Sequence, residues 1–233
     1  MYLNPTVEYK HISEWLSTLV GEKITPRNFV KRLSKHLNKH NHPVRVKLFT
    51  GERGALDPDE FTIGAEYDPD LDEKHRKQFI IDFIFNHPKT TPFELTAKMA
   101  DRMAIELMET LIHEYEHQRQ YRSRRYRVNK EKYISEHYDL EIKEHQEYLG
   151  DPDEIDAYAA NIAARYYILH YQLNKVNRLD SVDLKTYYKA FGKEHKVTKL
   201  LLSKVKKNIK YYKENDNGKN HRRAFKRPQF KRR

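Results

Sequence analysis

The chain has 233 residues, enough for one hydrophobic core with extensions, and it contains no cysteine. The lack of cysteine excludes a disulfide framework, a zinc ribbon and a thiol nucleophile, and it fits a reducing compartment. The net charge of +11 predicts an anionic partner, most often nucleic acid, or a basic surface that only aids solubility.

The remaining composition predicts a folded and mostly helical protein. The 17 Tyr and 10 Phe supply large apolar side chains, and 7 Gly and 9 Pro are few for a loop-rich β protein. The N-terminus lacks the basic region and apolar run of a signal peptide, and no apolar run is long enough to span a bilayer. We therefore expect a soluble intracellular protein, located in the cytoplasm and without a membrane partner.

Two amphipathic helices are predicted first, over residues 7–20 and 26–41, because apolar residues recur in them at helical spacing. The second helix carries His36 and His40 four residues apart. Lysines flank this pair and no carboxylate lies beside it in the sequence, so a solvated basic face is favoured over a metal site.

The periodicity then changes to that of strands. Residues 44–49, 61–68 and 78–85 are short, rich in β-branched or aromatic residues, and bounded by turn residues. They predict a small antiparallel or mixed sheet of about three strands.

The rest of the chain is predicted to be helical. A long helix should begin with Thr91 as N-cap, Pro92 at its first position and Glu94 at its third. Further helices are expected over 131–149, 151–171, 180–191 and 194–214. The fold class is thus α+β, mainly α. The expected organisation is an N-terminal helical region (1–43), a main domain (44–214) and a basic flexible tail (215–233).

The long helix contains the motif H-E-x-x-H, in which His113 and His117 lie four apart with Glu114 after the first. In a chain with 13 His, chance produces this motif in roughly one of sixteen shuffled sequences, so its context must decide. The wide apolar stripe upstream predicts a buried helix whose polar edge holds both histidines. One turn of separation lets two imidazoles reach one Zn²⁺ ion, with the glutamate facing the attacking water.

A third ligand is expected from a later helix. The extended pattern with a third histidine six residues on is excluded, because Gln120 and Ser123 stand at its glycine and histidine positions. Glu154, in GDPDEIDAYAANIAARYY, is the candidate, since the small alanines after it allow a close helix approach. Alternatively, Glu154 completes a capping box with Asp151. The ligand would then be one of a reserve set: Asp153, Asp156, His137 or His145.

These residues resemble the gluzincin group of zinc metallopeptidases, especially small single-domain members encoded by phages and mobile elements. The resemblance rests on HEYEH and on E-x-x-A at Glu154–Ala157, and it spans roughly residues 44–172. It implies that the helices form a zincin-like bundle that carries the motif. It further implies His113, His117 and Glu154 as zinc ligands, Glu114 as general base, and a protein or peptide substrate. It also implies that the strand at 78–85 pairs with an extended substrate.

The same enzymes stabilise the oxyanion of the tetrahedral intermediate with a Tyr or His, which no spacing identifies here. Four residues are candidates for this role: Tyr148, Tyr158, His137 and His145. Core packing is the competing role for each of them.

Two basic segments predict non-specific contact with nucleic acid. The first follows the motif, and the second is a tail with eight Lys or Arg in its last fifteen residues and two interleaved Phe. The candidate residues are Arg119, Arg122, Arg124, Arg125, Arg127, Arg222, Arg223, Lys226, Arg227 and Lys231. The alternative to a peptidase is a nucleic-acid-binding or virion-internal protein with a structural or inactive zinc site.

Overall fold

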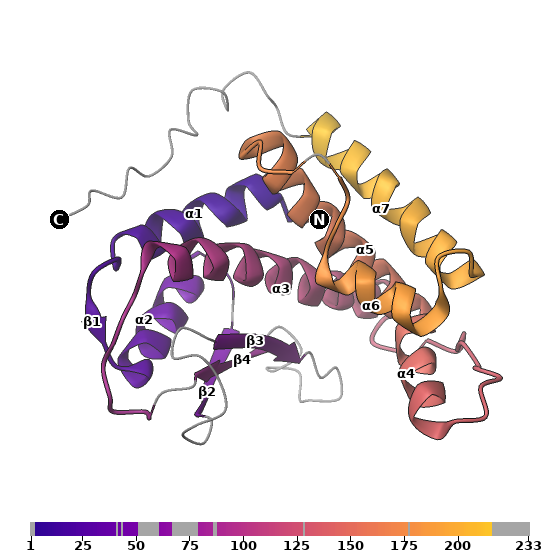
Figure 1. Ribbon diagram of the computed structural model, residues 1–233, viewed down its shortest axis with the longest axis horizontal. Helices are drawn as coiled ribbons and strands as arrows, with labels where there is room; N and C mark the ends of the chain where they lie inside the picture. The colour runs from indigo at the N-terminus through magenta and orange to yellow at the C-terminus, as the bar shows by residue number, and fades with distance from the viewer. Residues whose placement is uncertain are drawn as a thin grey trace. The chain divides into compact units, whose positions relative to one another are not determined.

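The computed structural model describes residues 3–40, 42, 44–50, 61–66, 79–85, 88–127, 129–176 and 178–215. Over these residues the fold is α+β and mainly α, as predicted. The helices are α1 (Pro5–Ser17), α2 (Pro26–Lys39), α3 (Ala97–Ser123), α4 (Leu140–Gly150), α5 (Pro152–Tyr166), α6 (Val182–Phe191) and α7 (Lys196–Asn215), with a π-helical turn η2 (Tyr167–Gln172) after α5 (Figure 1). The strands are β1 (Lys23–Ile24), β2 (Val44–Thr50), β3 (Phe61–Glu66), β4 (Phe79–Phe85) and β5 (Phe93–Glu94).

The chain divides into two compact units. One comprises the described residues from Tyr9 to Thr110, and the other comprises those up to Glu8 and from Leu111 onward. Helix α3 therefore contributes its first half to one unit and its second half to the other. The predicted division at residues 43 and 214 stays a prediction.

The unit from Tyr9 to Thr110 is built on α2 and a three-stranded mixed sheet. The strand order is β2-β4-β3, with β4 parallel to β2 and antiparallel to β3. Alternation along β4 buries Ile81 and Phe83 completely, whereas Ile84 is 38% exposed. Phe29 of α2 packs against Phe83 at a centroid distance of 5.5 Å and an interplanar angle of 65°, an edge-to-face contact that aromatic rings favour.

The expectation that residues 78–85 receive a substrate strand is wrong. Strand β4 is the central strand: Val44–Thr50 pairs with all of it on one side, and Phe61–Glu66 pairs with residues 80–85 on the other. Strand addition needs an open edge, and within the described sheet β2 and β3 form the edges.

Two helices, α3 and α4, begin at least five residues after their predicted first residues. Phe93 is extended and pairs with β1, which places its ring in the core at 6% exposure, so Thr91 caps no helix. Thr96 is the cap instead, because its hydroxyl oxygen accepts from the backbone N–H three residues on. Similarly, α4 begins at Leu140, where the carboxylate of Asp139 caps the helix, and not at 131.

The unit from Leu111 onward is a helical assembly around α5. Helices α5, α6 and α7 lie side by side (Figure 1). Close packing follows from the small residues of α5, because Ala157, Ala159, Ala160, Ala163 and Ala164 are all buried. The hydroxyl of Tyr212 on α7 donates to the carbonyl of Ala160 over 3.4 Å. No helix of the described residues has the length and apolar character needed to cross a bilayer.

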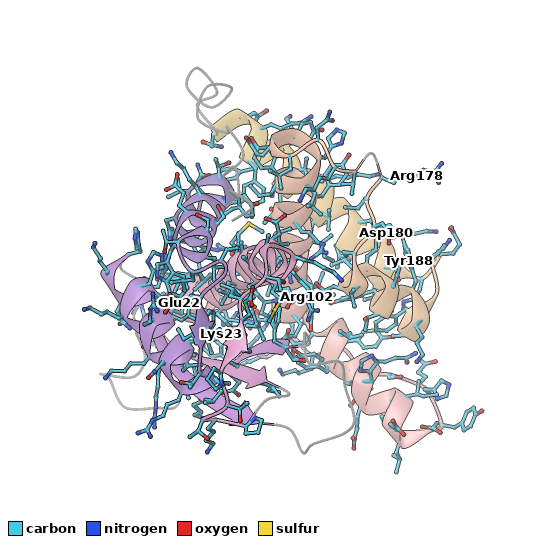
Figure 2. All side chains as sticks on the ribbon, turned by 60° about the vertical axis from the view of Figure 1, so that its left-hand side comes forward. Glu22, Lys23, Arg102, Arg178, Asp180 and Tyr188 are labelled. Carbon is cyan, nitrogen blue, oxygen red and sulfur yellow. The ribbon has the colours of Figure 1, made fainter. Side chains whose placement is uncertain are left out.

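Helix α6 has distinct inner and outer sides. Leu184 and Tyr187 are buried, and the Tyr187 hydroxyl donates to the carbonyl of Leu149 over 2.9 Å. Tyr188, together with Arg178 and Asp180 before the helix, points away from the helices (Figure 2). The inner side of α6 therefore faces α4 and α5.

Gly150, at the end of α4, is predicted to tolerate no side chain. A Cβ atom there would lie 2.4 Å from Cδ1 and 2.9 Å from Cβ of Tyr133, so the tyrosine backbone would have to move. We expect Gly150→Ala to lower the free energy of unfolding by about 1–3 kcal/mol. Gly64→Ala is the matched control, since a Cβ at Gly64 meets nothing within 4 Å. Equal denaturation midpoints for both variants would contradict the close approach.

Candidate metal centre

The candidate site begins with a polar stripe on α3. The apolar row Met99, Met103, Leu107 and Leu111 is buried, as predicted. The last turns of the helix and the residue directly after it carry a row of polar side chains instead: His113, His117, Gln120 and Arg124. Spacings of four, three and four place this row on one face of the helix and its C-terminal end.

Glu154 of α5 meets the two histidines of this row. The Nε2 atoms of His113 and His117 lie 3.1 Å apart. Glu154 Oε2 is 3.5 Å from His113 Nε2, and Glu154 Oε1 is 3.4 Å from His117 Nε2. All three residues belong to the same compact unit, so the structure brings the predicted ligand set together.

This triangle fits a tetrahedral metal ion. Zn–N distances of about 2.0–2.1 Å place the ligand atoms of a tetrahedral site about 3.3 Å apart. The three measured edges of 3.1, 3.4 and 3.5 Å lie around that value. In addition, Glu154 Oε2 is buried without a hydrogen-bond donor among the described residues, which a cation would remedy.

The electrostatics of the site favour positive charge. Burial alone would lower the pKa of His117, but the Glu154 carboxylate and the charge of Glu114 raise it to about 9. Burial alone would raise the pKa of Glu154, but the two imidazoles lower it to about 2. A site that holds a proton this strongly stabilises a cation in the proton's place.

The first turn of α5 excludes the capping-box alternative for Glu154. The cap is Asp151 alone, whose carboxylate accepts from the backbone N–H of Asp153 over 2.9 Å. The backbone N–H of Asp151, which a capping-box glutamate would receive, donates instead to the carbonyl of Tyr148. The Glu154 side chain is thus directed to the histidines.

Basic side chains pair with the neighbouring carboxylates of this turn. Arg124, directly after α3, forms a bidentate pair with Asp153, with Nη1–Oδ1 and Nη2–Oδ2 distances of 2.8 and 2.5 Å. Lys132 donates to Asp151 over 2.6 Å. Bidentate pairs fix orientation as well as distance, so Arg124 sets the position of the residue next to Glu154. Asp153 is therefore no metal ligand here.

Gln120 connects the same two helices behind His117. Its Oε1 lies 3.0 Å from His117 Nδ1, and its Nε2 donates to the carbonyl of Asp153 over 2.8 Å. An Nδ1–H that donates to Gln120 leaves the lone pair of Nε2 directed at the site. In the sequence Gln120 stands out only as a departure from a longer motif, so this role could not be found there.

Two further carboxylates surround the histidines. Glu114 is 5% exposed, and its charge contributes to the raised pKa values of both His117 and Tyr158, so it lies near both. Asp183 of α6 accepts from Asn161 Nδ2 over 3.2 Å. Burial raises the pKa of Asp183 and the charge of His113 opposes this rise, which places the carboxylate near the imidazole.

Tyr148 and Tyr158 are the oxyanion candidates that the structure brings to the site. The Tyr158 ring meets the His113 ring edge-on at 4.7 Å, and burial raises the Tyr158 pKa to about 12. Burial also raises the pKa of Tyr148, and the charge of Glu154 adds to this rise. Both phenols therefore stay protonated near neutral pH and can donate hydrogen bonds.

The remaining predicted alternatives lie elsewhere. His137 stacks on Tyr138 and accepts from the backbone N–H of Asp139, while His145 is exposed on α4. Asp156 pairs with Lys204 of α7. The histidine–glutamate triangle contains none of these three residues.

A cavity of about 440 Å³ opens beside Glu154. Its walls come from the irregular segment after α3, from α4 and from the start of α5. The lining residues are Lys132, Tyr133, Ile134, Glu147, Tyr148, Asp151 and Glu154. Its volume lies in the range of ligand-binding pockets. Tyr148, one of the lining residues, is 49% exposed.

The chain reverses sharply between the end of α3 and this segment. Arg125 and Tyr126 both have positive φ angles, 53° and 62°, in the left-handed region that side chains disfavour. Arg124 Nε donates to the carbonyl of Arg127 over 3.1 Å and thereby closes the reversal. The guanidinium that binds Asp153 thus also holds this backbone.

The predicted nucleic-acid residues divide into two groups. Arg119 pairs with Glu116 and Arg124 with Asp153, so both serve contacts within the protein. Arg122, Arg125 and Arg127 are exposed. The other candidates lie outside the described residues: Arg222, Arg223, Lys226, Arg227 and Lys231.

Comparisons of the chain with models of protein families, with curated proteins and with solved structures find no match.

Arg124 is expected to act on the metal site through Asp153. We expect Arg124→Ala to weaken Zn²⁺ affinity by about tenfold, because the turn that carries Glu154 loses its bidentate partner. Arg122→Ala removes an exposed arginine from the last turn of α3 and should leave the affinity unchanged. Competition with a chromophoric chelator measures both, and equal affinities would show that Arg124 does not position Glu154.

Proposed function

We propose that the protein is a zinc-dependent metallopeptidase that hydrolyses peptide bonds. The observation that supports this most directly is the convergence of His113, His117 and Glu154 within 3.5 Å of one another, beside the buried Glu114. Zinc held by these three ligands would supply a Lewis acid that polarises a carbonyl and acidifies water. The ligand set also agrees with the gluzincin resemblance of the sequence.

Glu114 is the proposed general base. It follows a ligand on the same helix and lies near His117 without belonging to the ligand triangle. A carboxylate in this position accepts a proton from the attacking water and passes it to the amine of the leaving peptide.

Tyr148 is the proposed donor to the developing oxyanion. Its hydroxyl is protonated near neutral pH and lies close to Glu154, while its ring lines the cavity. A donor preorganised in this way stabilises negative charge on the scissile carbonyl oxygen more strongly than water does. Tyr158 is the less suitable candidate because its ring packs between His113 and Tyr187.

The rival function is a nucleic-acid-binding or virion-internal protein with a structural zinc site. The net charge of +11 and the exposed arginines after α3 favour it. Structural zinc sites, however, are closed by four protein ligands, whereas catalytic sites keep a position open. Three converging ligands, one of which (Glu154) lines a cavity, correspond to the open type.

Glutamine variants of Glu114 and Glu154 test the peptidase proposal. Glu114→Gln keeps the shape but cannot accept a proton, so we expect Zn²⁺ to be retained while peptide hydrolysis falls about 100-fold or more. Glu154→Gln removes a charged ligand and should weaken both Zn²⁺ binding and hydrolysis. Metal content, melting temperature and hydrolysis of a peptide library are measured for each variant.

Glu144→Gln on the exposed side of α4 controls for the loss of a glutamate. If Glu154→Gln keeps its zinc and activity, the third ligand is wrong. If the wild-type protein binds zinc at these residues but hydrolyses no peptide, the structural-site rival replaces the peptidase.

We further propose that the basic segments bring the enzyme to nucleic acid or to a nucleoprotein assembly. The support is the charge of the chain, the exposure of Arg122, Arg125 and Arg127, and the basic tail of the sequence. Contacts of this type are made with phosphates and carry no base specificity.

Removal of residues 219–233 tests the contribution of the tail. The deletion eliminates eight Lys or Arg, so we expect weaker nucleic-acid binding with a shallower dependence on salt, by about 0.9 in slope for each phosphate that the tail neutralises. Binding is measured by fluorescence anisotropy over a salt titration with two unrelated sequences. Identical slopes for full and shortened chains would exclude the tail.

A further inference from the structure

Among the described residues, four histidines of the first two helices and the segment after them lie close together. His11 lies on α1, His36 on α2, His40 at the C-cap of α2, and His42 two residues later. All four belong to the unit from Tyr9 to Thr110. They share no residue with the site of His113, His117 and Glu154.

The cluster is not the solvated basic face that the sequence predicted. His36 stacks on Trp15 with a centroid distance of 4.8 Å, and the ring of His11 stacks on that of His42 at 5.5 Å. His42 is 3% exposed. Only His40 of the four is exposed, because it ends the helix.

Three of the rings present nitrogen atoms to one another. His11 Nδ1 lies 3.1 Å from His36 Nε2. One ring nitrogen of each of His11, His36 and His40 lies within 4.8 Å of the other two. The spacing of His36 and His40 is the one that lets two imidazoles of a helix reach one ion.

We propose that His11, His36 and His40 form a second metal site that binds a divalent transition ion such as Zn²⁺. The 3.1 Å separation is close to the edge of about 3.3 Å between nitrogen ligands of tetrahedral zinc. Three imidazoles select Zn²⁺, Cu²⁺ or Ni²⁺ over Mg²⁺ and Ca²⁺, which prefer oxygen.

Binding requires one ring to turn. The rings of His11 and His40 are parallel, with an interplanar angle of 4° and centroids 4.2 Å apart. A ligating imidazole has the ion in the plane of its ring, and two parallel stacked planes cannot contain the same ion. His40 is the exposed ring of the three, so in this proposal it rotates to close the site while His11 and His36 stay in place.

The test counts metal on the full-length chain. Apoprotein is titrated with Zn²⁺ against a chromophoric chelator in the wild type, in His36→Gln, in His40→Gln and in the double variant His113→Ala/His117→Ala. We expect the wild type to bind two equivalents and each of these variants to lose one. In the double variant, adding His40→Gln should weaken the remaining equivalent by more than about tenfold.

The control is His145→Gln, which removes an exposed histidine of α4. Circular dichroism establishes that each variant is folded. If the half-buried His36 proves necessary for folding, His40→Gln alone tests the second site. Absorption of bound Co²⁺ in the double variant reports a tetrahedral nitrogen site. A second equivalent that survives both His36→Gln and His40→Gln, or that His145→Gln removes equally, overturns the proposal. So does a wild type that binds one equivalent lost with His113 and His117.

Discussion

The candidate site depends on how the start of α5 distributes its negative charge. Asp151, Asp153 and Glu154 carry three carboxylates within a single helical turn, and like charges this close repel one another unless each has its own cation. The structure supplies Lys132 to the first and Arg124 to the second. The third carboxylate, that of Glu154, faces the imidazoles of His113 and His117 instead of a basic side chain. This arrangement makes Glu154 a candidate metal ligand rather than one more surface acid.

Helix α3 organises the other half of the site. One face buries the apolar row, and the face that follows it carries His113, His117 and Gln120, with Arg124 directly after the helix. The two histidines are candidate metal ligands, whereas Gln120 and Arg124 bind Asp153 at the start of α5. The two histidine ligands and Gln120 are therefore parts of the same helical repeat, and the distances between them follow from helix geometry.

Much of this can be predicted from the sequence, and the exceptions have physical reasons. Strong periodicity predicts the three main strands and most helices within a few residues, and HEYEH with Glu154 predicts the triangle. Helix starts are displaced because burial of Phe93 outweighs a possible cap at Thr91, and both choices look alike locally. The sequence suggests a nucleic-acid role for Arg124 because its partner lies 29 residues away, although its spacing from His117 already places it on the ligand face. The pairing of both sides of β4 likewise depends on partners distant in sequence.

The reversal after α3 couples the backbone to the ligands. Two consecutive residues in the left-handed conformation cost about 1–2 kcal/mol each relative to ordinary backbone. Relaxation of this segment to ordinary backbone angles would therefore lower its free energy. The Arg124 guanidinium opposes relaxation because it binds both the carbonyl of Arg127 and the carboxylate of Asp153. Release of that one side chain would remove a restraint from the backbone reversal and from the turn that carries Glu154 at the same time. Local opening of the chain after α3 and displacement of the Glu154 ligand are therefore coupled.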